Sequence, residues 1–187
     1  MFNFPIAICW LVFIIFWIAS SLGVKNNIQE NNRQVSSYFK LMIPTAILIL
    51  LFNTTRLRQL LNYHILPVTL FVQTTGIFIC ALGVAFSIWA RTHLGKNWGL
   101  PMAMKEKPDL VVTGPYHFIR HPIYTGISIA MLGSMVTVGF IWLISLILFC
   151  AYFIYSAKKE EKLMLLQFPK GYHDYIERTK MFIPFIY

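Results

Sequence analysis

The stretch GPYHFIRHPIYTG, residues 114–126, stands at the start of a long apolar run and sets the expected fold. Pro122 has no backbone N–H, so it fits the first position of a helix but not the interior of one. A membrane helix is therefore expected to begin at Pro122, with Arg120 and His121 at its positive end. The unpaired N–H groups of its first turn favour an anion. Polar groups held there indicate a binding site; the alternative is a simple interfacial anchor, since such side chains favour headgroup depth.

The composition is that of an integral membrane protein. Of 187 residues, 57% are apolar and 12% are charged, and the mean hydropathy is +0.63. Soluble domains are nearer 45–50% apolar and about 25% charged. Nearly every residue is needed for spans and connections, so a single membrane domain over residues 1–187 is expected. Residues 1–5 carry no Lys or Arg, so the first apolar run is expected to be retained rather than cleaved.

The apolar runs predict an all-α fold with five transmembrane helices. A bilayer core needs about 20 apolar residues in a helix. The expected spans are about 4–22, 39–52, 65–90, 123–137 and 140–157. The last two come from 35 uncharged residues, which would extend about 52 Å as one helix and exceed a single crossing. We therefore expect a turn near Val138-Gly139.

The distribution of positive charge favours the same topology. With five spans, fourteen Lys and Arg residues fall on one side and two on the other. With one span over 123–157, the count is eight on each side. The positive-inside rule therefore puts the 91–122 segment and the C-terminal tail in the cytoplasm. The net charge of +9 is spread between apolar runs, as in loops that face anionic lipid, and no nucleic-acid partner is expected.

Three polar clusters are expected to meet on the cytoplasmic face. They are Tyr116, Arg120, His121 and Tyr124; the charged run 158–162; and the tail residues Tyr172, Tyr175, Ile176 and Thr179, which share one helical face. A tight hairpin of the last two spans would bring Glu160 near His121. The alternative for the charged run is a solvated helix face.

Other chemistries lack their motifs. The sequence contains no HExxH, P-loop, GxGxxG or nucleophile elbow, and no metal is expected. Cys9, Cys80 and Cys150 lie in separate apolar runs and are predicted to be buried hydrophobes. No ionisable residue lies in the middle of an expected span, which argues against a transporter or channel.

Three motifs in order resemble the isoprenylcysteine carboxyl methyltransferase family, which is related to the phospholipid N-methyltransferases. The first is Leu94-Gly-Lys-Asn-Trp98, and the second is the 114–126 stretch. The third is Glu160-Glu161, followed by Phe168, Tyr172, Tyr175 and Ile183-Pro184. Together they define a catalytic half at about 89–184.

The resemblance implies a small multi-span enzyme that binds S-adenosyl-L-methionine in a cytosolic pocket. The last two spans, the 91–122 loop and the tail would form this pocket, and the acceptor would be lipophilic or lipid-modified. The implied cofactor-binding residues are Pro108, Asp109, Leu110, Val111, Tyr116, His121, Pro122, Ile123, Tyr124 and Glu160. Arg120, Glu161 and Arg178 are the implied catalytic residues.

One departure from the family pattern concerns the acceptor. The prenylcysteine enzymes place an Arg four residues before the first Glu to hold the substrate carboxylate, and this chain has Ser156 there. Lys158, Lys159 or Arg178 are possible substitutes. A carboxylate acceptor needs no base, whereas an amine or thiol must lose a proton, and Glu161 or His121 are candidates to take it.

Three alternatives remain open at this point. They are a phospholipid amine N-methyltransferase, an NADPH-dependent membrane reductase on a similar scaffold, and a non-catalytic membrane scaffold. For a methyltransferase, the acceptor is expected to enter sideways from the lipid. Because lipid and an apolar groove solvate a chain alike, activity is expected to depend only weakly on tail length.

The topology gives a first testable prediction. A reporter fused to the C-terminus should be active in the cytoplasm and an N-terminal fusion should not, because fourteen of the sixteen Lys and Arg residues belong to the cytoplasmic side. Paired fluorescent-protein and alkaline-phosphatase fusions measure this. A C-terminal fusion that is active only on the far side would contradict the five-span topology.

Overall fold

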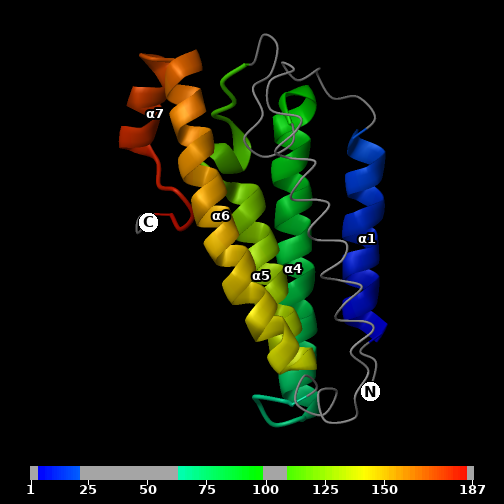
Figure 1. Cartoon of the computed structure of the whole chain (residues 1–187). Coiled ribbons are helices and arrows are strands. Elements are labelled where there is room, and N and C mark those ends of the chain that lie inside the picture. Colours follow the sequence, from blue (N-terminus) through cyan, green and yellow to red (C-terminus); the bar gives the residue numbers. More distant parts are fainter. Residues whose placement is uncertain (1–3, 22–62, 99–108, 185–187) are drawn as a thin grey trace, which may run out of the picture.

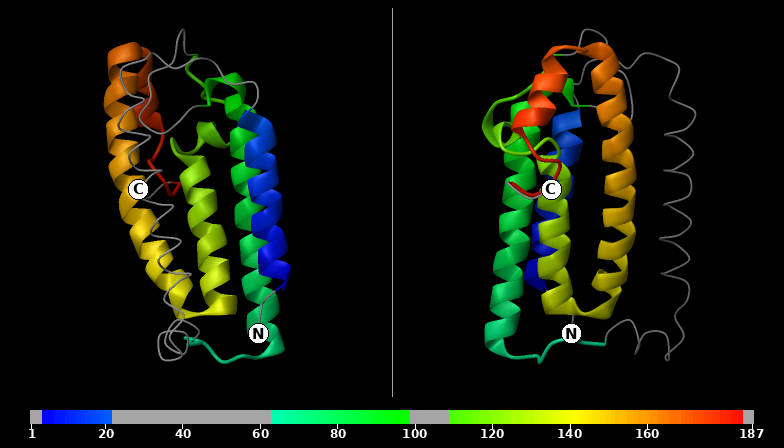
Figure 2. Two further views of the ribbon diagram at one scale, coloured as in Figure 1. Left: turned by 45° about the vertical axis from the view of Figure 1, so that its right-hand side comes forward. Right: turned by 90° about the vertical axis from the view of Figure 1, so that its left-hand side faces the viewer.

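The computed structural model describes residues 4–21, 63–98 and 109–184, and the regular elements in these ranges are all helical. The long helices α1 (Phe4–Ser21), α4 (Leu70–Leu94), α5 (Pro122–Val138) and α6 (Phe140–Gln167) run side by side (Figure 1). The short α7 (Gly171–Arg178) lies at the end of the bundle where α6 finishes. Two single 3-10 turns, η2 (Gly95–Asn97) and η3 (Gly114–His117), lie at the same end. Figure 2 shows α5 between α4 and α6, with α1 against α4.

Small residues let α4 and α5 pack with their backbones in contact. Gly83 of α4 lies against Ala130, and Gly133 of α5 lies against Cys80; a Cβ at either glycine would overlap the opposite backbone. Close approach of this kind is how helices associate in a membrane, where no hydrophobic force drives them together. Ser87 is fully buried in this interface and donates its hydroxyl to the Gly83 carbonyl at 3.0 Å.

A single glycine joins α5 to α6 and forms the predicted hairpin. Gly139 has a φ of 121°, which favours glycine, and a Cβ there would overlap the Tyr63 carbonyl. That carbonyl accepts a hydrogen bond from the Phe140 N–H at 2.9 Å. The start of α5 at Pro122 and the turn at Val138-Gly139 are therefore confirmed.

Two helix boundaries differ from the bounds of the expected spans. The third span was expected from 65, but α4 begins at Leu70, because Pro67 precedes it and the Thr69 side chain caps it by accepting from the Val72 N–H at 3.3 Å. The last span is expected to end at 157, and α6 continues past that bound as a helix to Gln167, so the charged run 158–162 is helical. Residues 157–167 are mostly strong helix formers, and the next helix breaker is Pro169.

Two of the described helices have the length and apolar composition of membrane spans. α4 and α6 are long and apolar enough to cross a bilayer, and α1 and α5 are shorter apolar helices. Large apolar side chains are open to the surroundings on the outer face of α4, with Leu70 80% and Phe71 78% exposed. The expected span 39–52 lies outside the described residues, so the count of five spans and the single domain remain predictions.

The contact between α4 and α5 yields a stability prediction. Gly83→Ala should lower the free energy of unfolding by about 1–3 kcal/mol, because the added methyl group overlaps the Ala130 backbone. Ala85→Val adds methyl groups at an exposed position of the same helix and serves as the control. Thermal unfolding of the purified protein in detergent measures both variants. If Gly83→Ala melts at the same temperature as the wild-type protein, the tight contact between α4 and α5 is contradicted.

Candidate active site

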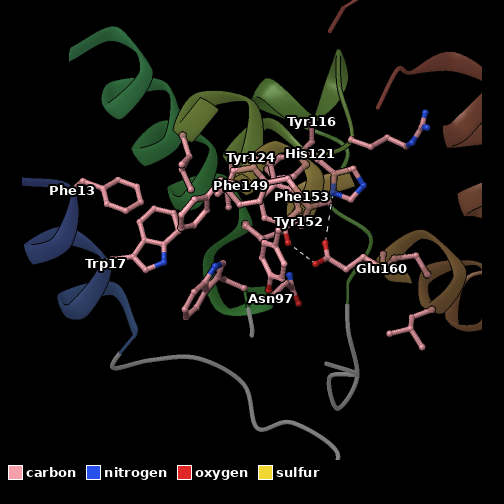
Figure 3. A pocket seen from close by; sticks show the side chains of 18 of the residues that line it. Phe13, Trp17, Asn97, Tyr116, His121, Tyr124, Phe149, Tyr152, Phe153 and Glu160 are labelled. Carbon is pink, nitrogen blue, oxygen red and sulfur yellow. Dashed lines mark hydrogen bonds and ion pairs between the residues drawn. The ribbon is translucent and has the colours of Figure 1, made fainter. Parts of the chain in front are cut away.

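A cavity of about 750 Å³ lies between α1, α5 and α6 and reaches the end of the bundle where α7 lies. Figure 3 shows Phe13 and Trp17 of α1 on one side of it and Glu160 and His121 on the opposite side. Its polar end is lined by Asn97, Asp109, Tyr116, Arg120, His121, Tyr124 and Glu160. Its apolar part is lined mainly by Trp10, Phe13, Ile14, Trp17, Ile127, Met131, Trp142, Phe149 and Phe153. One cavity thus joins a charged region to an aromatic one.

Glu160 is held at the cavity wall by its neighbours on α5 and α6. The Tyr124 hydroxyl donates to Glu160 Oε1 at 2.6 Å, and the Ser156 hydroxyl donates to the same oxygen at 3.0 Å. His121 Nδ1 lies 3.6 Å from Glu160 Oε2, so the predicted approach of these two residues is confirmed. Ser156 is fully buried, and its hydroxyl serves to fix the carboxylate.

Arg120 connects the segment before α5 to α6 and to the tail. Its Nε donates to Glu161 Oε1 at 2.6 Å, and its Nη1 donates to the Thr179 carbonyl at 2.6 Å. Glu161 lies beyond the expected span 140–157. Burial alone raises the pKa of Glu161, but the nearby His121 and Arg120 side chains lower it by more, so the net pKa falls below its usual range. Glu161 is therefore the ionised partner that holds Arg120 in place.

The tail is bound along the 114–121 segment. The Arg120 N–H donates to the Lys180 carbonyl at 2.8 Å, and the His121 N–H donates to the Met181 carbonyl at 3.1 Å. The Tyr175 hydroxyl donates to the Tyr116 carbonyl at 2.6 Å. Burial raises the pKa of Tyr175, so its phenol remains a donor at neutral pH. The three polar clusters of the sequence therefore meet in one place.

His121 is a buried side chain between the two glutamates of α6. Its ring is 8% exposed and stacks on Tyr124, with ring centroids 5.6 Å apart. Its Nε2 lies 3.4 Å from Glu161 Oε1, an ion pair when the imidazole is protonated, and makes no hydrogen bond among the described residues. This nitrogen therefore faces Glu161, which does not line the cavity.

The predicted site residues divide into three groups. Those that line the cavity are Asp109, Leu110, Val111, Tyr116, Arg120, His121, Ile123, Tyr124 and Glu160. Pro122 and Glu161 belong to the surrounding structure without lining the cavity. Arg178 also does not line it, and its Nε donates to the Asp174 carbonyl of its own helix at 3.1 Å. Pro108 lies outside the described residues.

Comparison with known proteins assigns the chain to a family. Residues 71–171, more than half of the chain and the part that contains the Glu160 and His121 cluster, match the phospholipid methyltransferase family. The chain belongs to this family.

Two curated relatives are similar to part of the chain. The protein-S-isoprenylcysteine O-methyltransferase of Schizosaccharomyces pombe is 30% identical over 119 residues, which cover 61% of this chain and 50% of that protein. The nickel-cobalt-cadmium resistance protein NccN of Alcaligenes xylosoxydans xylosoxydans is 30% identical over 94 residues, which cover 49% of this chain and 44% of that protein. The matches thus span about half the length of these relatives. Within the described residues, no group of three potential metal ligands comes together.

Several residues of the site were not predicted. The aromatic wall from α1 consists of Trp10, Phe13 and Trp17, whose spacing of three and four residues places them on one helical face. That spacing was a usable signal. No comparable signal marked Arg91, which is buried, donates to the Ser20 carbonyl at 2.5 Å and lies over the Trp98 ring, 4.5 Å from its centroid. It joins the end of α1 to the wall of the cavity.

Docking of the tail gives a local prediction. Tyr175→Phe removes the hydroxyl that bonds to the Tyr116 carbonyl. The free energy of local unfolding of α7 should therefore fall by about 1 kcal/mol. Hydrogen exchange of the α7 amides measures the change. Tyr63→Phe, at an exposed tyrosine far along the chain, is the matched control. Unchanged protection in Tyr175→Phe would show that this bond does not hold the tail.

Proposed function

We propose that this protein is an S-adenosyl-L-methionine-dependent methyltransferase that acts on a lipophilic acceptor from the cytoplasmic side of the membrane. The observation that carries the proposal is the single cavity that joins the Glu160 and His121 cluster to an aromatic wall. A water-soluble cofactor suits the first region, and an apolar acceptor suits the second. Membership of the phospholipid methyltransferase family supports the same activity.

The residues at the polar end fit the chemical groups of this cofactor. The carboxylates of Asp109 and Glu160 match an ammonium group or ribose hydroxyls. The rings of Tyr124 and Phe153, stacked with centroids 4.6 Å apart, favour a flat base or a cation. When bound, the cofactor supplies a methyl group activated by a positively charged sulfur.

The protein's main task in this reaction is alignment. Holding two reactants in line supplies up to about 7–11 kcal/mol of a barrier. Arg120 and Glu161 serve this task indirectly, because their ion pair fixes the segment that carries His121. An amine or thiol acceptor would also release a proton, which His121 is placed to hold between Glu160 and Glu161.

The acceptor is an isoprenylcysteine-like molecule in our main proposal and a phospholipid amine in the alternative. The similarity to the Schizosaccharomyces pombe enzyme supports the first. Ser156 favours testing the second, because it leaves a neutral side chain four residues before Glu160 and because the Arg120 guanidinium already bonds to Glu161. Radiolabelled methyl transfer to N-acetyl-S-farnesylcysteine and to phosphatidylethanolamine, assayed in parallel, distinguishes the two.

Cofactor binding is the first test of the proposal. Glu160→Gln and His121→Ala should each weaken binding of S-adenosylhomocysteine by roughly five- to 150-fold, because each loses a hydrogen bond worth about 1–3 kcal/mol. Isothermal titration calorimetry on the purified protein measures the affinity.

Glu177→Gln and His173→Ala are matched controls, since these exposed residues pair with each other on α7 outside the cavity. Both controls should keep the wild-type affinity. Unchanged affinity in the two site variants would move the cofactor elsewhere. Saturable binding of NADPH without binding of S-adenosylhomocysteine would favour a reductase instead.

A further inference from the structure

Of the residues of α1 and α6 that line the cavity, Trp10 and Trp142 lie farthest along these helices from its polar end, and their indoles stack. Trp10 of α1 and Trp142 of α6 have ring centroids 5.2 Å apart and planes inclined by 17°, and both line the cavity. We propose that this pair limits the length of the acceptor's apolar chain. The proposal rests on the proposed function, because it takes the occupant of the aromatic region to be the acceptor bound at the polar end.

A hydrogen bond to α5 fixes the orientation of the Trp10 ring. Trp10 Nε1 donates to the hydroxyl of Ser134 at 3.0 Å, and Ser134 is fully buried. That hydroxyl donates in turn to the Ala130 carbonyl at 2.9 Å and lies 3.6 Å from Cys80 Sγ. A hydroxyl has one donor and two acceptor positions, so this one is fully used. Trp10 is therefore a fixed wall rather than a side chain free to rotate away.

The indole pair lies well below the polar end. Ten residues of α5 separate Tyr124, beside Glu160, from Ser134, which bonds to Trp10; this is about 15 Å along the helix axis. On α6, fourteen residues from Ser156 to Trp142 correspond to about 21 Å. The wall between these levels is mainly apolar, with Phe13, Ile127, Met131 and Phe149, and includes the hydroxyl-bearing Ser145 and Tyr152. A chain attached to a group near Glu160 can therefore extend toward the indoles.

The consequence is a steric limit on chain length. Lipid and an apolar cavity solvate a hydrocarbon chain alike, so a chain shorter than the limit gains little from each added carbon. A chain that reaches the indoles has to displace two packed rings, and overpacking of a filled site is unfavourable. This proposal differs from the sequence-based expectation that tail length matters little, and the experiment below decides between the two.

The experiment measures binding rather than turnover. Wild-type protein in lipid nanodiscs, with S-adenosylhomocysteine present, is titrated with N-acetyl-S-(n-alkyl)cysteines of increasing chain length at equal mole fraction in the bilayer. A second series carries an ethanolamine headgroup. We expect affinity to stay nearly constant and then to fall by roughly five- to 150-fold over a few carbons, the range that overpacking costs.

Variants then locate the limit. In Trp10→Ala and Trp142→Ala the decrease in affinity should occur at longer chains. In Ser134→Ala the decrease should be more gradual, because Trp10 loses the hydrogen bond that fixes its ring. Ser134→Ala removes no cavity-lining ring, which keeps the test valid if a tryptophan variant fails to fold. Trp89→Ala is the matched control, since Trp89 is 45% exposed on α4 and does not line the cavity.

The possible outcomes separate this proposal from the proposed function. The proposal that Trp10 and Trp142 limit chain length would be overturned if affinity fell at the same chain length in wild type, both tryptophan variants and Ser134→Ala. It would also be overturned if affinity showed no such fall in either headgroup series. If the chain length at which affinity falls increases in the tryptophan variants but S-adenosylhomocysteine does not bind, the role of the two tryptophans is supported and the methyltransferase activity is rejected.

Discussion

The turn at Gly139 is the constraint on which the site depends. Because one residue joins α5 to α6, side chains at similar distances on either side of the turn must face each other. Tyr124 thereby lies opposite Ser156 and Glu160, and three hydroxyl and carboxylate groups form one bonded cluster. A longer connection would allow α6 to slide along α5 and would separate them. The positive φ of Gly139 and the Tyr63 carbonyl beside it leave little room for another residue.

Three parts of the chain meet beside this hairpin at the polar end of the cavity. The 114–121 segment brings Tyr116 and Arg120, α6 brings Glu160 to the cavity and Glu161 behind it, and carbonyls of the tail bond to Arg120 and His121. Arg120 is the common element, because it contacts Glu161 through charge and the tail through the Thr179 carbonyl. Its burial strengthens both contacts, since the surrounding medium screens them poorly. A rigid cluster of this kind suits a reaction that depends on alignment.

The sequence predicted the parts of the fold that follow from helix chemistry. Pro122 and Gly139 marked the two ends of α5 correctly because each imposes a backbone requirement. The expected span end at 157 did not give the end of α6, because the charges from Lys158 onward stop a membrane span without stopping a helix. The spacing of the α1 aromatics placed them on one helix face, but it did not tell whether that face met lipid or a cavity, so their place in the site was missed.

The site residues were predictable only in part, for a similar reason. Motif spacing identified Tyr124, His121 and Glu160, which do come together. It could not assign a task to Ser156, because a small residue in an apolar helix is equally suited to packing. The spacing of four residues puts Ser156 and Glu160 on one face of α6, and only the hairpin shows that Tyr124 joins them. The exposed position of Arg178 also depends on how α7 lies against the bundle, which no local pattern encodes.

The docked tail has a consequence for how the protein matures. During synthesis the 114–121 segment and α6 are made well before the residues at 179–182 that bond to Arg120, His121 and Thr125. The helices can therefore enter the membrane while the polar end of the cavity is still incomplete. Completion waits for the last segment of the described chain to leave the ribosome and fold back, so a nascent chain that has inserted is not yet a competent binding site.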